Sequence, residues 1–161
     1  MTISSVLHKF GAYIATAVIT AVLTIWGGSY VNFLQQNRAV IENDFTLFKA
    51  SSAEMLQALG AYTERARTGA PIDSESRQRF RNGLLKLHSE AEAIAKREPR
   101  VRDEYAEVAK SLLALRETAD SFSVPLDAKR FVESTSSYID ADSKFISKVS
   151  DIQRKFIPPF F

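Results

Sequence analysis

The chain has 161 residues, of which 25% are charged and 45% are hydrophobic, and its formal net charge is +2. These ordinary values exclude wholesale disorder and a polytopic membrane protein, and so small a net charge gives no reason to expect a nucleic-acid partner. The absence of cysteine excludes disulfides, thiolate metal sites and cysteine nucleophiles. The two histidines, His8 and His88, lie too far apart for a His-pair metal motif, so we expect no metal and no cofactor.

A long uncharged segment lies near the N-terminus. No residue from Phe10 to Asn37 carries a formal charge, and about 20 apolar residues suffice for a helix to cross a bilayer. Aromatic residues gather at both ends of this segment, as they do at membrane interfaces. The sequence therefore predicts a short flank at 1–9 and one transmembrane helix at 10–36 that acts as a signal anchor. A cleaved signal peptide is the alternative, although its apolar core is usually shorter.

Small side chains recur every four residues along this predicted membrane helix. They are Ala12, Thr16, Thr20, Thr24 and Gly28. In lipid, such a ridge lets two helix backbones approach closely, and threonine hydroxyls can bond across the contact. We therefore expect packing against another membrane-protein subunit or self-association through this helix. The alternative is that these residues are simply common in membrane helices.

The remaining sequence has apolar residues in alternating steps of four and three, a spacing typical of helices packed against one another. Breaks that contain glycine or proline divide residues 37–156 into four helices, at about 37–67, 74–98, 100–123 and 126–156. Their short connections favour an antiparallel up-down-up-down four-helix bundle. The predicted fold is thus all-α, with one transmembrane helix, this bundle and an apolar C-terminal tail at 157–161.

This plan resembles chemoreceptor-type ligand-binding domains, in which a four-helix bundle follows a first membrane helix. The resemblance is one of architecture and carries over no residues, because fold analogy alone does not determine function. It suggests one alternative function for this chain, an extracytoplasmic ligand-binding or sensing domain that acts with a separate signalling partner.

Three polar residues fall at about the same height when helix turns are counted along the predicted bundle. They are Ser52, His88 and Asp142. A buried aspartate needs donors or a shifted pKa, and we expect His88 to be the partner of Asp142. The three could be solvated at the edge of the core, form a buried polar layer or line a small-ligand pocket. No strained turn or oxyanion donors accompany Ser52, so we expect no catalytic residues.

Basic residues also gather at the end of the predicted bundle nearest the membrane segment. They are Arg97, Arg100, Arg102, Arg154 and Lys155, and the tail adds Phe160 and Phe161. Basic residues beside aromatic ones suit a surface of anionic lipid headgroups. The alternative is that these cations are solvated and the tail folds against protein.

Taken together, these features predict a non-enzymatic accessory or adaptor subunit of a larger membrane-protein complex. It would span the cell (inner) membrane once and bind other subunits through its membrane helix and its bundle. We expect the bundle on the extracytoplasmic side, because long C-terminal domains translocate largely regardless of their charge.

Overall fold

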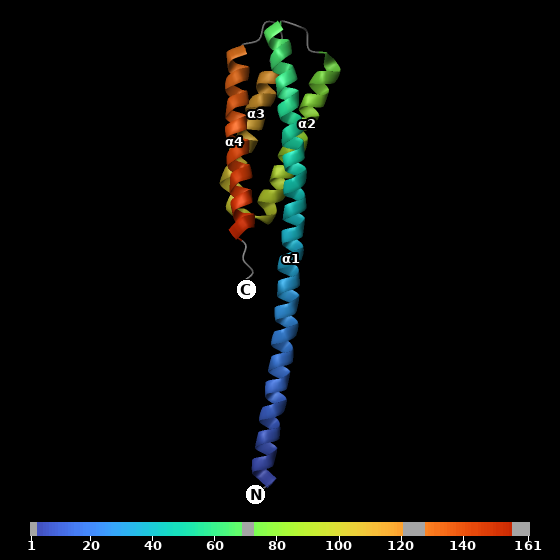
Figure 1. The fold of residues 1–161 in the computed structure, drawn as a ribbon, viewed down its shortest axis with the longest axis vertical. Coiled ribbons are helices and arrows are strands. Elements are labelled where there is room, and N and C mark those ends of the chain that lie inside the picture. Colours follow the sequence, from blue (N-terminus) through green and yellow to red (C-terminus); the bar gives the residue numbers. More distant parts are fainter. Residues whose placement is uncertain (1–2, 69–72, 121–127, 156–161) are drawn as a thin grey trace. The chain divides into compact units, whose positions relative to one another are not determined.

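A computed structural model describes residues 3–68, 73–120 and 128–155, without the side chains of residues 3–15, 17, 66, 67 and 128. Within these ranges the chain forms four α-helices and one 3₁₀ turn, and it contains no strand (Figure 1). The helices are α1 (Ile3–Thr68), α2 (Ser74–Arg97), α3 (Arg102–Asp120) and α4 (Ala128–Lys155), and the 3₁₀ turn is η1 (Pro99–Val101). The prediction of an all-α chain is confirmed.

The chain divides into two compact units, Met1–Val40 and Ile41–Phe161. We call the second the helical unit. Helix α1 contributes to both, because no helix end separates residue 36 from residue 37, where the sequence placed the end of the membrane segment. The absence of glycine and proline between Gly28 and Gly60 explains this continuity, since these residues are the strongest local helix breakers.

Local chemistry explains where α2 begins and ends. The Asp73 carboxylate accepts a 2.7 Å hydrogen bond from the backbone N–H of Ser76 and so caps the first turn. This bond, and another from Arg65, hold the pKa of Asp73 well below its ordinary value. At the other end, Pro99 has no N–H to continue the helix and starts η1 instead.

The helical unit has one apolar core to which all four helices contribute. Aromatic contacts connect α1 with two of its neighbours. Tyr62 stacks on Phe80 of α2 at a centroid distance of 4.6 Å, and Phe48 packs edge-to-face against Phe145 of α4 at 5.1 Å. Burial of one such side chain contributes about 1.5–3 kcal/mol, so each of these positions contributes substantially to the stability of the unit.

Candidate functional site

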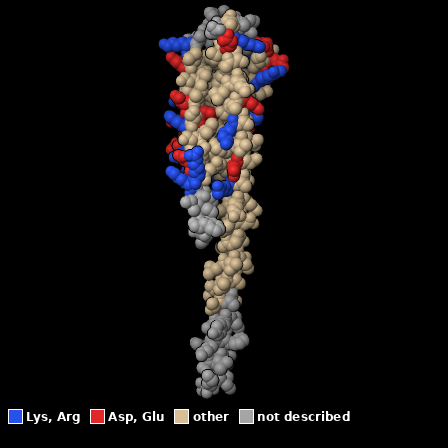
Figure 2. Space-filling model, in the orientation of Figure 1, with Lys and Arg blue, Asp and Glu red and all other residues tan. Residues whose placement is uncertain are grey.

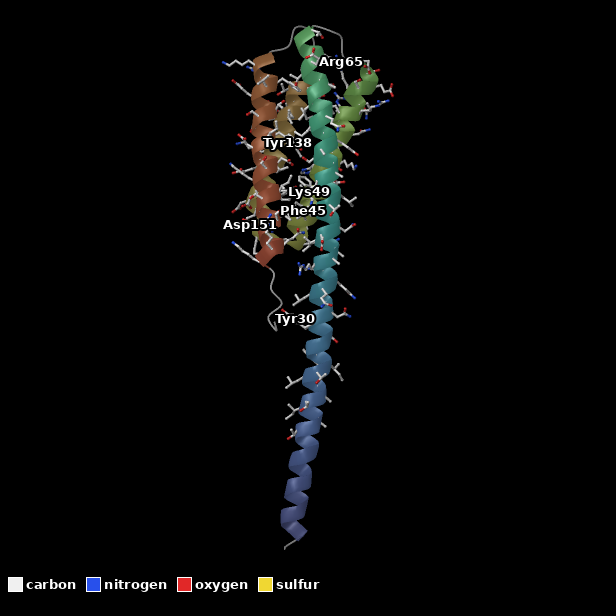
Figure 3. All side chains as sticks on the ribbon, in the orientation of Figure 1. Tyr30, Phe45, Lys49, Arg65, Tyr138 and Asp151 are labelled. Carbon is white, nitrogen blue, oxygen red and sulfur yellow. The ribbon has the colours of Figure 1, made fainter. Side chains whose placement is uncertain are left out.

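A buried hydrogen bond joins α1 to α4 inside the helical unit. The Ser52 hydroxyl donates to Oδ2 of Asp142 at 2.8 Å, and both residues are buried. The hydroxyl of Tyr138, one turn before Asp142, donates to Oγ of Ser52 at the longer distance of 3.4 Å. Figure 3 labels Tyr138 on the side of α4 that faces α1. The structure thus brings two of the three predicted polar residues together and adds a tyrosine to them.

The Asp142 carboxyl has little to stabilise its charge. Its Oδ1 is buried and has no hydrogen-bond partner, and the residue is only 5% exposed. Burial raises the pKa of Asp142, and the hydrogen bond from Ser52 only partly opposes this shift. Burial and the neighbouring carboxyl also raise the pKa of Tyr138. Because the group is closed to solvent, no substrate reaches Ser52 in this conformation.

His88 does not take part in this group, and the expectation that it is the partner of Asp142 is corrected. Its ring stacks on Tyr105 of α3, with a centroid distance of 5.8 Å and an interplanar angle of 27°. Counting turns predicts the height of a residue in a bundle, but the contact it makes also depends on the direction in which its side chain leaves the helix. Leu87 points into the core, and His88, one residue later, lies toward α3.

A second polar pair, which was not predicted from the sequence, joins α1 to α2. Ser51 donates a 3.1 Å hydrogen bond to Oε1 of Glu90, whose other oxygen is buried and has no partner. The two consecutive serines therefore bond to different neighbouring helices, because successive side chains leave a helix about 100° apart. The signal in the sequence was the Ser51–Ser52 dipeptide, which places two polar residues among the apolar positions of this part of α1.

One helix of the described chain, α1, is long and apolar enough near its N-terminus to cross a membrane. This confirms the candidate membrane span by length and composition, a test that a signal sequence also passes. On the predicted ridge, the hydroxyls of Thr20 and Thr24 donate at 2.8 Å to the carbonyls of Thr16 and Thr20. Both hydroxyl protons are therefore already used within α1. A Cβ at Gly28 would meet nothing within 4 Å, and the side chain of Ala12 lies outside the described residues.

The predicted basic cluster carries less available charge than its composition suggests. Arg97 pairs with Asp44 at 3.1 Å, and Arg100 pairs with Glu98 at 2.7 Å. Arg102, Arg154 and Lys155 are exposed, whereas Phe160 and Phe161 lie outside the described residues. Figure 2 shows acidic side chains interspersed among the basic ones on the visible face of the helical unit.

Within the part of the chain whose side chains are described, no group of three His, Cys, Asp or Glu residues could hold a metal ion. No family model, curated protein or solved structure matches the chain.

Proposed function

We propose that this chain is a non-enzymatic, membrane-anchored accessory or adaptor subunit of a larger membrane-protein complex. The observation that supports this function is an apolar surface on the N-terminal part of α1 that is exposed in the part of the chain that the structure describes. Trp26 is 76% exposed, and Leu23 and Ile25 are also exposed. Side chains of this size need lipid or another protein to cover them. A helix that carries such a surface and continues into a packed unit suits an anchored binding protein.

The proposal includes an antiparallel up-down-up-down arrangement of the helices in the helical unit. Contacts between helices support it, because their residue numbers run in opposite directions. Between α1 and α4, Phe48 meets Phe145 and Tyr62 stacks on Phe131. Between α3 and α4, Lys144 pairs with Glu107, and Thr118 shares a hydrogen bond with Ser134. Short connections favour the same arrangement.

In this proposal the helical unit lies on the extracytoplasmic side of the inner membrane, and its basic end contacts anionic lipid headgroups. Arg102, Arg154 and Lys155 would make most of this contact, because Arg97 and Arg100 already have carboxylate partners. Each basic residue near such a surface contributes about 1 kcal/mol, so three are enough for a weak, salt-sensitive attraction but not for anchoring. The membrane helix therefore supplies the anchoring.

The adaptor role is tested by purifying the tagged full chain from native membranes in a mild detergent and identifying its partners by mass spectrometry. We expect another membrane protein to be recovered in a fixed stoichiometry. Thr20→Leu places a bulky group on the small-residue ridge and should reduce this recovery, because it keeps the helix backbones apart. Val22→Leu is the matched control, since Val22 lies on the opposite side of α1. Recovery of the chain alone, or equal recovery with both variants, contradicts the proposal.

One observation favours the alternative function, a sensing domain that works with a separate signalling partner. Oδ1 of Asp142 and Oε2 of Glu90 are buried acceptors without a hydrogen-bond partner, and a small ligand rich in donors could satisfy them in a conformation in which the helices separate and admit it. Such a ligand would raise the melting temperature of the chain, by an amount that grows with the logarithm of its concentration relative to its Kd. A screen of small cationic and amide ligands by thermal shift tests this alternative, and the absence of any shift counts against it.

A further inference from the structure

An uncharged strip of surface runs along the junction of α1 and α4. We call it the uncharged seam, and it consists of Ala53, Leu56, Gly60 and Thr63 on α1 with Val132, Ser136 and Ile139 on α4. All seven residues are exposed. Figure 2 shows this face: in the upper part of the helical unit uncharged side chains cover α1 and its junction with α4, with charged ones on either side, whereas charged side chains lie in the middle of the same face farther down.

Contacts between the two helices bring these residues to the same level. The Ser52–Asp142 hydrogen bond lies at one end of the seam. The stacking of Tyr62 on Phe131 lies at the other end. Leu56 is one turn beyond Ser52, and Ile139 is about one turn before Asp142, so these two side chains flank the junction at similar heights. Leu56, Val132 and Ile139 are 41%, 55% and 41% exposed, respectively.

The other junctions of the helical unit are bridged on the outside by ion pairs. Lys86 pairs with Glu54 across α1 and α2, and Arg81 pairs with Asp120 across α2 and α3. Lys148 pairs with Glu104 across α3 and α4. Exposed ion pairs keep a helix junction compatible with water, whereas the uncharged seam presents branched apolar side chains there. The seam is therefore the junction whose chemistry best suits a protein contact.

We propose that the uncharged seam is the surface on which a second copy of this chain docks. A partner with a charged face would lose the hydration of its charges against this strip and gain no ion pair in return, so the seam selects an uncharged helical face. The seam of a second copy is such a face. A two-fold axis places the same patch on both copies, where bulky Leu56, Val132 and Ile139 can pack against small Ala53 and Gly60.

The size of the seam indicates how strong this contact is. Three partly exposed aliphatic side chains offer only a few hundred Å² of apolar surface. A stable soluble dimer buries about 800 Å² on each partner. The contact is therefore weak by itself and depends on the membrane helix, which holds the copies in one orientation and raises their effective concentration. The inference thus depends on the proposed anchoring, but not on the adaptor role.

Disulfide trapping in membranes tests the proposal, since the chain contains no cysteine of its own. Gly60→Cys and Ser136→Cys place single thiols on the seam, and a Cβ at Gly60 meets nothing within 4 Å. Leu85→Cys on α2 and Leu113→Cys on α3 are matched controls, because both residues are exposed on other faces of the helical unit. The full-length variants are oxidised in native membranes and analysed without reductant. We expect a disulfide-linked dimer with each seam variant, at a yield several-fold higher than with either control.

A second substitution shows whether the trapped contact uses the seam. In the Gly60→Cys background, Ile139→Lys should lower the dimer yield several-fold, whereas Leu113→Lys should leave it unchanged. Circular dichroism of each variant confirms that the helices are retained. Equal trapping at all four cysteine positions, or capture of a different protein by the seam cysteines, overturns the proposal. Co-purification tests the adaptor role separately. The adaptor role and the docking of a second copy on the uncharged seam can therefore be contradicted independently of each other.

Discussion

The two parts of α1 have the same secondary structure but different surroundings. In the N-terminal part, apolar residues occur around the whole circumference, and Trp26 is 76% exposed. In the part within the helical unit, apolar residues recur every three or four positions, and Phe48 and Tyr62 are buried against other helices. Helicity alone therefore says nothing about the environment of a helix. The distribution of apolar side chains around the helix indicates whether lipid or protein will cover it.

The largest expected effect on stability is a difference between two phenylalanines of α1, Phe48 in the helical unit and Phe33 in the N-terminal unit. Phe48→Ala should lower the free energy of unfolding of the helical unit by about 3–5 kcal/mol, because it leaves a cavity beside Phe145. Phe33→Ala should leave that free energy unchanged, because Phe33 is exposed in the N-terminal unit. Urea denaturation of the full chain in detergent, followed by circular dichroism, measures both. Similar losses of unfolding free energy for the two variants would contradict the difference in surroundings between the two parts of α1.

A smaller effect on stability is expected from the hydroxyl hydrogen bonds of α1. The Ser52 hydroxyl bonds to another helix, whereas the Thr24 hydroxyl bonds within α1. Asp142→Ala should cost about 1–3 kcal/mol at low pH, where the carboxyl is protonated, because the Ser52 hydroxyl loses its buried acceptor. Thr24→Val is the control, because the Thr24 hydroxyl bonds only to the Thr20 carbonyl of its own helix. Denaturation midpoints of the two variants decide the point. An unchanged midpoint for Asp142→Ala means that the Ser52 bond contributes no stability.

The pH dependence of stability refines this result. Burial raises the pKa of Asp142 in the folded chain, whereas the unfolded chain releases this proton near pH 4. The contribution of Asp142 to stability is therefore fully present below about pH 4 and is lost as the pH rises through the folded-state pKa. Asp142→Asn removes this titration, so we expect the variant to gain stability relative to the natural chain between about pH 4 and pH 7. A constant difference in unfolding free energy across this range contradicts the raised pKa.

The smallest expected effect on stability comes from replacing a glycine in each of the two units. A Cβ at Gly28 meets nothing within 4 Å, whereas a Cβ at Gly83 would lie 2.8 Å from Cε of Met55. Gly28→Ala should not alter the stability of the helical unit. Gly83→Ala should change it by less than about 1 kcal/mol, because the gain in helix propensity is offset by displacement of the flexible methionine. In a Met55→Ala background the same substitution should become more favourable. An identical effect in both backgrounds would falsify this account of the contact.

Much of the secondary structure could be predicted because its signals are local. The cap at Asp73 and the proline at Pro99 led to a helix at 74–98, and α2 runs Ser74–Arg97. The heights of Ser52 and Asp142 could also be predicted, because the rise of 1.5 Å per residue is the same in every α-helix. The direction of His88 could not, since it depends on how α2 is rotated against its neighbours. The role of Glu90 was missed for the same reason.

Periodicity, capping residues and an uncharged apolar run are local properties of the chain, and they suffice to predict an all-α protein with a candidate membrane helix. Packing of side chains from helices distant in sequence determined the rest. It paired Ser52 with Asp142, placed His88 against Tyr105 and neutralised Arg97 with Asp44. Each contact depends on the distance and rotation between two helices, which arise from the simultaneous fit of the whole core and not from any short stretch of sequence.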